Sequence, residues 1–208
     1  IGSHASSRMA FLSPQQTRFL AALLANAGHT VGREQLVRAA FGQDAARGSA
    51  RVFARTGGSW TEEAALQGLP AAPDDRFGWS VAGGGDVDAD GTPDILVGLP
   101  YGVNTATTGN VQVYAGRTGL LIRTVAAGYL YGYAIATADL DGDGFSDIIT
   151  SSGEFALPSA SHINPVKAYS GFNGQLIGLY SGIPYGANNP AESWGMALAA
   201  GRDLNGDG

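Results

Sequence analysis

The sequence predicts a mainly β protein, a partial β-propeller of four-stranded antiparallel blades preceded by a short α-helical segment. From residue 48 onward, short β-type runs are separated by glycine, of which the chain has 32 among 208 residues. One order of features, an aromatic residue, glycine, an apolar strand and an acidic loop, occurs three times, at 77–100, 131–153 and 194–208. The first aspartates of these loops are 53 and 64 residues apart, which suits one propeller blade per repeat.

The N-terminal part differs from the rest of the chain. Residues 1–10 begin without methionine and resemble a tag or cloning remnant, so they are left out of the fold prediction. Residues 11–45 are predicted to be helical. Ser13 suits a helix N-cap, and apolar residues follow at helical spacing up to Gly28. A second short helix is expected from about Arg33 to Ala40.

Residues 48–208 are predicted to contain half a blade, two whole blades and the start of another. The half blade is the hairpin at 48–68, and each whole repeat continues into a second hairpin with Thr118-Gly119 or Asn173-Gly174 at its turn. A single blade leaves both faces of its sheet uncovered, and propellers have about four to eight blades. We therefore expect either a piece of a longer propeller or a homo-oligomer whose copies complete the ring by strand exchange.

Composition excludes several kinds of site. The chain has no cysteine, so disulfides, thiolate nucleophiles and zinc–thiolate centres are excluded. Its net charge is -6, and the acidic residues of the β region gather mainly in the three loops rather than on a solvated face. No apolar run approaches the roughly 20 residues that a transmembrane helix needs, so no membrane span is predicted.

The acidic loops predict a cation site. Both "DVDADGTPD" (86–94) and "DLDGDGFSD" (139–147) have aspartate at positions one, three, five and nine and glycine at position six. Carboxylates this close repel one another by up to about 4 kcal/mol per pair at an effective dielectric constant near 20. Alternate side chains can converge on one point as the loop curls, with the carbonyl of position seven filling a gap. Irregular, carboxylate-rich oxygen coordination suits Ca²⁺ better than Mg²⁺.

The predicted calcium ligands form two complete sets and one partial set. An EF-hand would need glutamate at position twelve, where Val97 and Thr150 stand, so that interpretation fails. A polar turn without metal is the alternative, and recurrence at equivalent places in the repeat argues against it. The ligands are Asp86, Asp88, Asp90, the Thr92 carbonyl and Asp94; Asp139, Asp141, Asp143, the Phe145 carbonyl and Asp147; and Asp203, Asn205 and Asp207.

With these features in place, residues 48–208 resemble the FG-GAP repeats of integrin α-subunit propellers and their bacterial relatives. Phe77-Gly78, Tyr131-Gly132 and Trp194-Gly195 match the family's aromatic-glycine motif, and Gly98-Leu99-Pro100 stands at its Gly-Ala-Pro position. The second repeat departs from the pattern, with "TSSG" at 150–153. The resemblance implies structural calcium, no enzymatic activity, and a scaffold for adhesion or for binding a protein or carbohydrate ligand, extracellular or at the cell surface.

Residues 12–42 resemble the start of the winged-helix effector domain of OmpR-like response regulators. The recognition helix and wing do not follow Gly42, so nucleic acid is not an expected partner. His162, in a polar loop, has no catalytic motif around it. Two other functions stay open: a part of a larger secreted hydrolase or lyase, and a DNA-binding regulator acting through residues 11–45.

Overall fold

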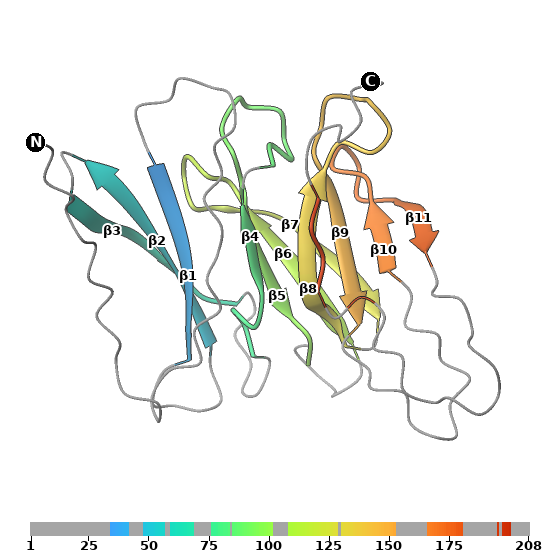
Figure 1. The fold of residues 1–208 in the computed structure, drawn as a ribbon, viewed down its shortest axis with the longest axis horizontal. Helices are drawn as coiled ribbons and strands as arrows, with labels where there is room; N and C mark the ends of the chain where they lie inside the picture. Colours follow the sequence, from blue (N-terminus) through green and yellow to red (C-terminus); the bar gives the residue numbers. More distant parts are fainter. Residues whose placement is uncertain are drawn as a thin grey trace, which may run out of the picture.

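The computed structural model describes ten parts of the chain, and all regular structure in them is β-strand. Eleven strands in these parts form three antiparallel sheets that lie side by side, which confirms the mainly β, blade-like class (Figure 1). No helix in the same parts is long and apolar enough to span a bilayer. The described residues are 34–41, 48–56, 59–68, 76–83, 85–101, 108–128, 130–152, 166–180, 195 and 197–200.

Two of the sheets have the strand order predicted for a blade. In each, four strands follow one another along the chain as a meander. The middle sheet contains β4 (Val81–Gly83), β5 (Ile95–Leu99), β6 (Gly109–Tyr114) and β7 (Leu121–Gly128). The third sheet contains β8 (Tyr131–Ala138), β9 (Asp147–Ser152), β10 (Val166–Tyr169) and β11 (Leu176–Tyr180).

The first sheet corrects the helical prediction for residues 11–45. Its order is β1 (Glu34–Phe41), β2 (Gly48–Thr56) and β3 (Ser59–Leu66), so the expected β2–β3 hairpin is present and the second predicted helix is a strand. β1 pairs with β2 along its whole length. An eight-residue apolar pattern does not decide between helix and strand, and pairing supplies partners for the backbone groups at the edge of the hairpin. The first predicted helix and residues 1–10 lie outside the described residues.

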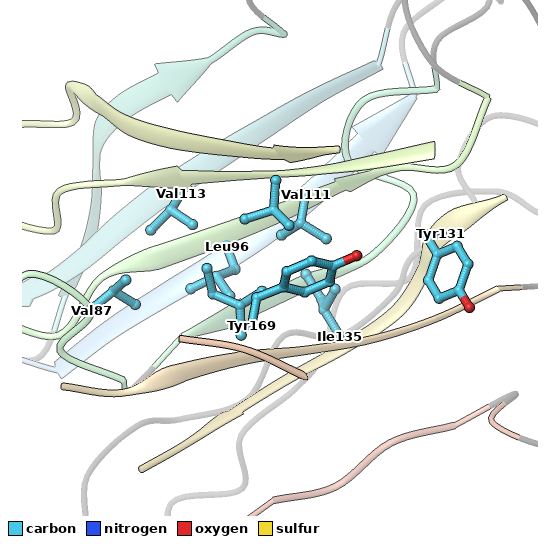
Figure 2. Close-up of a cluster of buried hydrophobic side chains, with 9 residues drawn as sticks. Val87, Leu96, Val111, Val113, Tyr131, Ile135 and Tyr169 are labelled. Atoms are coloured by element: carbon cyan, nitrogen blue, oxygen red, sulfur yellow. The ribbon is translucent and has the colours of Figure 1, made fainter. Parts of the chain in front are cut away.

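The middle sheet is buried on both faces. Every residue of β5 is buried, and successive side chains point to opposite sides. Ile95, Val97 and Leu99 belong to a core with Ala50 and Val52 of the first sheet. Leu96 belongs instead to a second core that lies between the middle and third sheets, and Figure 2 shows it with side chains from both. That core consists of Val87, Leu96, Val111, Val113, Val125, Tyr131, Ile135, Ile148 and Tyr169.

The aromatic-glycine motif forms the joint between these two sheets. Tyr131 is buried in the second core, and the next residue, Gly132, lies against the backbone of the middle sheet. A Cβ on Gly132 would lie 2.4 Å from the carbonyl oxygen of Asn110, and its φ is +90°. The Ser80 hydroxyl donates a hydrogen bond of 2.6 Å to the Gly132 carbonyl. Glycine is required here because no side chain fits between the sheets.

The following joint uses a different serine for the same hydrogen bond. When the first two repeats are aligned on their aromatic-glycine motifs and acidic loops, Ala134 stands at the position of Ser80. Ser151, in the "TSSG" stretch, stands at the position of Gly98. The Ser151 hydroxyl donates to the carbonyl of Gly195, the glycine of the third motif. The departure of the second repeat from the family pattern is therefore compensated. In the middle sheet the hydroxyl directly precedes the first strand, β4, whereas in the third sheet it lies on the second strand, β9.

Candidate metal centre

The two acidic loops occupy the same position in neighbouring sheets. Residues 86–94 connect β4 to β5, and residues 139–147 connect β8 to the first residue of β9. Both loops lie at the same end of their sheets (Figure 1). The turn chemistry explains why the chain curls here, because aspartate side chains readily bond to backbone amides two or more residues ahead.

The first loop is held by its own carboxylates. The Asp86 carboxylate accepts hydrogen bonds from the backbone N–H of Asp90 at 3.1 Å and of Gly91 at 2.9 Å. Asp88 accepts from the N–H of Asp90 at 3.2 Å, and Asp90 accepts from the N–H of Thr92 at 2.8 Å. Gly91 has φ +83°, the left-handed conformation that the turn requires at position six.

The second loop repeats this arrangement. The Asp139 carboxylate accepts from the N–H of Gly144 at 3.0 Å, and Gly144 has φ +88°. Asp141 accepts from the N–H of Asp143 at 3.2 Å, and Asp143 accepts from the N–H of Phe145 at 2.9 Å. Two loops of different sequence thus fold alike at the positions that their aspartates and glycines share.

Asp94, at position nine, is buried and ties its loop to a distant turn. Only 1% of the residue is exposed. Its carboxylate accepts from the N–H of Val87 at 2.8 Å and from the N–H of Gly116, in the β6–β7 turn, at 3.0 Å. Burial raises the pKa of Asp94 to about 6, against a smaller lowering by the hydrogen bonds from Gly116 and Val87. Asp88 and Asp86 add to the rise in pKa by repulsion.

Asp147 has the same role in the second loop. It is fully buried and accepts hydrogen bonds from the N–H of Leu140 at 2.8 Å and from the N–H of Gly171, in the β10–β11 turn, at 2.9 Å. Burial again raises the pKa of the carboxyl group, and the two hydrogen bonds oppose that rise. Position nine therefore fastens each loop to the second hairpin of its own sheet.

Each loop brings three carboxylates within reach of one ion. Asp86, Asp88 and Asp90 offer oxygens that all lie within 4.8 Å of one another, and so do Asp139, Asp141 and Asp147. These are hard oxygen donors with net negative charge, as Ca²⁺ and Mg²⁺ require. The parts played by Asp94, Asp143 and the carbonyls of Thr92 and Phe145 stay predictions. The third predicted set, Asp203, Asn205 and Asp207, lies outside the described residues.

One residue of this region was missed by the sequence analysis. Ser146, directly before Asp147, donates its N–H to the Asp86 carbonyl at 2.8 Å, and its hydroxyl accepts from the Asp86 N–H at 3.1 Å. The first loop has Pro93 at the equivalent position, so the repeat pattern carries no signal for this contact. It depends on the packing of one sheet on the next.

Comparison with known proteins agrees with this geometry. Residues 86–150 match a family model described as an FG-GAP-like repeat, and that stretch runs from the first loop through the second. This part of the chain belongs to the FG-GAP-like repeats. The chain is 31% identical over 119 residues to integrin alpha-7 of Rattus norvegicus and of Homo sapiens, which is 53% of this chain and 10% of theirs. It is 33% identical over 107 residues to integrin alpha-E of Mus musculus, 44% of this chain and 9% of that one.

These matches confirm the resemblance that the motifs predicted. The chain spans about a tenth of the length of the curated relatives it matches. The FG-GAP-like match includes both acidic loops. Both clusters of three carboxylates therefore lie within the matched repeat sequence. The winged-helix resemblance of residues 12–42 gains no such support, because its last part forms β1.

Proposed function

We propose that the chain is a calcium-stabilised FG-GAP propeller scaffold without enzymatic activity, which binds a protein or carbohydrate ligand at a cell surface or in the extracellular space. One observation carries the proposal: a cluster of three carboxylates, with loop positions one and three in common, occurs in the same loop of two neighbouring sheets. A single cluster of acids is common without a metal. A cluster that recurs in the two repeats that the structure describes indicates a property of the repeat.

The residues of each loop would hold the ion at the end of the sheet. Asp86, Asp88 and Asp90 would bind it in the first loop, and Asp139, Asp141 and Asp147 in the second. A bound cation supplies the positive charge that these clustered carboxylates lack. Backbone amides alone cannot balance net charges, since each brings only a partial positive charge. The loops also join the first two strands of each sheet, so ordering them stiffens the sheet.

Calcium is the cation that this donor set favours. Mg²⁺ requires a near-ideal octahedron and retains several waters, whereas Ca²⁺ accepts irregular sets of six to eight oxygens. Extracellular calcium modules bind with dissociation constants of about 0.1 to 1 mM, which suits a calcium-rich compartment. The match to integrin alpha chains supports a role in adhesion and a location outside the cell.

The calcium role is tested by calorimetric titration of the chain with Ca²⁺ and, separately, with Mg²⁺. Two binding events with Ca²⁺, weaker heat with Mg²⁺ and a lower melting temperature in chelator are expected. Asp88→Asn should remove one event, whereas the control Glu63→Gln, which removes one exposed negative charge from β3, should leave both. Absence of heat together with an unchanged melting temperature in chelator would refute the calcium role.

The scaffold role has a test of its own. The immobilised chain is screened against arrays of glycans and of extracellular proteins, once in calcium and once in chelator. Binding that requires calcium is expected, since the loops shape the ends of the sheets. A chain that binds calcium but none of these partners would contradict the scaffold role and leave the ion role intact.

A further inference from the structure

The two acidic loops are bonded directly to each other across the joint between the sheets. The backbone N–H of Asp86 donates to the Ser146 hydroxyl at 3.1 Å, and the backbone N–H of Ser146 donates to the Asp86 carbonyl at 2.8 Å. Asp86 is the first carboxylate of one loop, and Ser146 precedes the last carboxylate, Asp147, of the other. A two-bond link therefore joins a candidate ligand of one site to the neighbour of a candidate ligand in the next.

The link exists because Gly85 lets the loops approach. A Cβ at position 85 would lie 2.7 Å from both Cβ and Oγ1 of Thr137 and 2.8 Å from Cβ of Ser146. Carbon atoms do not come this close, so any side chain would push the second loop away from Asp86. Gly85 is also buried.

The middle sheet also holds the second loop indirectly, through the β10–β11 turn. The Arg123 guanidinium, on β7, donates to the backbone carbonyls of Ser170, Gly171 and Phe172 in the β10–β11 turn. The N–H of Gly171 in that turn donates to Asp147. The middle sheet thus contacts the second loop directly through Asp86 and indirectly through Arg123.

We propose that Ser146 is a positioning residue that couples the two loops, so that calcium bound in residues 139–147 raises the calcium affinity of residues 86–94. This inference rests on the proposed calcium role. Calcium that orders the exposed carboxylates Asp139 and Asp141 would restrain the loop that carries Ser146, and Ser146 would then hold the Asp86 backbone in place, so the first loop loses less entropy on binding. Linkage requires the reverse effect to be equal.

Electrostatic repulsion between the two bound cations opposes this coupling, and its salt dependence distinguishes the two effects. A cation in one loop reduces the negative field that attracts the second cation, and salt screens this effect over a Debye length of about 8 Å at 0.15 M. Hydrogen-bonded ordering is not screened in this way. Coupling through Ser146 should therefore increase between about 0.02 and 0.15 M salt, whereas a purely electrostatic interaction between the loops would be negative and weaken.

The experiment measures calcium binding to the full chain by calorimetry at both salt concentrations. Asp141→Asn disables the second loop, and at 0.15 M salt we expect the first loop to bind about fivefold or more weakly in this variant than in the parent chain. Ser146→Ala should weaken the first loop similarly, and adding Asp141→Asn to it should cause no further loss. Ser146→Thr, which keeps the hydroxyl, should restore the parent affinity.

A second readout follows the link without loading the first loop. In Asp88→Asn, whose first loop is disabled, calcium should slow hydrogen exchange of the Asp86 amide, and Ser146→Ala should abolish that slowing. Ser80→Ala is the matched control, because it removes a hydroxyl from the joint between the sheets without touching either loop. It should leave unchanged the ratio between the first-loop calcium affinities measured with and without a functional second loop.

The outcomes separate this inference from the calcium role. If the parent chain binds calcium at both loops and the first loop binds with the same affinity in Asp141→Asn, the coupling is overturned and the calcium-stabilised scaffold stands. If disabling the second loop weakens the first loop as much in a Ser146→Ala chain as in the parent chain, the role of Ser146 is overturned. A chain that binds no calcium at either loop would overturn the calcium role, and the coupling with it.

Discussion

At the scale of single residues, Asp94 and Asp147 differ from the other aspartates of their loops. Both are buried, whereas Asp88 and Asp90 are exposed. Each connects its loop to a turn more than 20 residues further along the chain, through Gly116 or Gly171. The side chain at position nine therefore has a structural task that does not depend on an ion, in addition to its proposed part in binding one.

The raised pKa of Asp94 predicts a pH dependence in chelator. Its pKa is about 6 in the folded chain and 3.8 in an exposed aspartate, so folding favours the protonated form. That stabilisation is complete below about pH 4 and is lost as the pH rises through about 6. Relative to Asp94→Asn, the free energy of unfolding of the parent chain should fall by at most about 3 kcal/mol between pH 4 and 7.5.

This pH dependence is measured by urea denaturation of both chains in chelator. The difference between them cancels the titration of the remaining groups. Saturating calcium should oppose the trend, because a nearby cation favours the charged carboxylate. A difference in unfolding free energy that stays constant with pH in chelator would show that burial does not govern the ionisation of Asp94.

The sequence predicted which aspartates share a loop, because spacing and turn chemistry are local properties. It could not predict that Asp94 and Asp147 would be buried, since their second hydrogen bonds come from turns far along the chain. Ser146 was unpredictable for a stronger reason. Its partner, Asp86, is 60 residues away and belongs to the adjacent sheet, so no pattern within one repeat records the contact.

At the scale of strands and turns, local signals predicted hairpins well and β1 badly. Gly119 and Gly174 adopt φ values of +68° and +75° at the two predicted turns, where glycine is the residue that favours positive φ. The four-strand meanders followed from the repeat. The strand β1 could not be predicted this way, because its conformation is fixed by pairing with β2 and not by its own eight residues.

The hydroxyl at each joint gives a prediction at this scale. Ser80→Ala would leave the Gly132 carbonyl without its donor at a buried position, and we expect the free energy of unfolding to fall by about 1–3 kcal/mol. Urea denaturation in calcium is the measurement. The control is Thr118→Ala, whose hydroxyl accepts from the Leu120 N–H in an exposed turn, and it should cost less than about 1 kcal/mol. Equal losses of unfolding free energy in Ser80→Ala and Thr118→Ala would contradict a special contribution of the hydrogen bond at the joint.

At the scale of the whole molecule, the third sheet presents apolar side chains where the middle sheet buries them. Leu140 is 45% exposed, whereas Val87, at the same place in the first loop, is 1% exposed. Tyr180 of β11 is 51% exposed, whereas Val125 of β7, its counterpart in the repeat, is 4% exposed. The sequence predicted that a blade needs neighbours, and the middle sheet shows what a neighbour covers.

This exposed face predicts binding of an apolar dye. The chain should enhance the fluorescence of ANS under native conditions, and the double substitution Leu140→Lys, Tyr180→Lys should lower that enhancement. Leu120→Lys is the control, since Leu120 is exposed at an isolated turn position, and it should change the signal little. A dye signal unaffected by the double substitution would place the apolar surface elsewhere.

The alternative placement of the joint hydroxyl restricts how such a chain can evolve. Each sheet brings its own donor, Ser80 beside Gly98 in one and Ser151 beside Ala134 in the next. Duplication or exchange of an entire repeat preserves one donor for each joint. A crossover between the first two strands of a repeat would instead pair Ala134 with Gly98, leaving none, or Ser80 with Ser151, crowding two hydroxyls together. We therefore expect genetic recombination to be tolerated at the borders of repeats and penalised inside them.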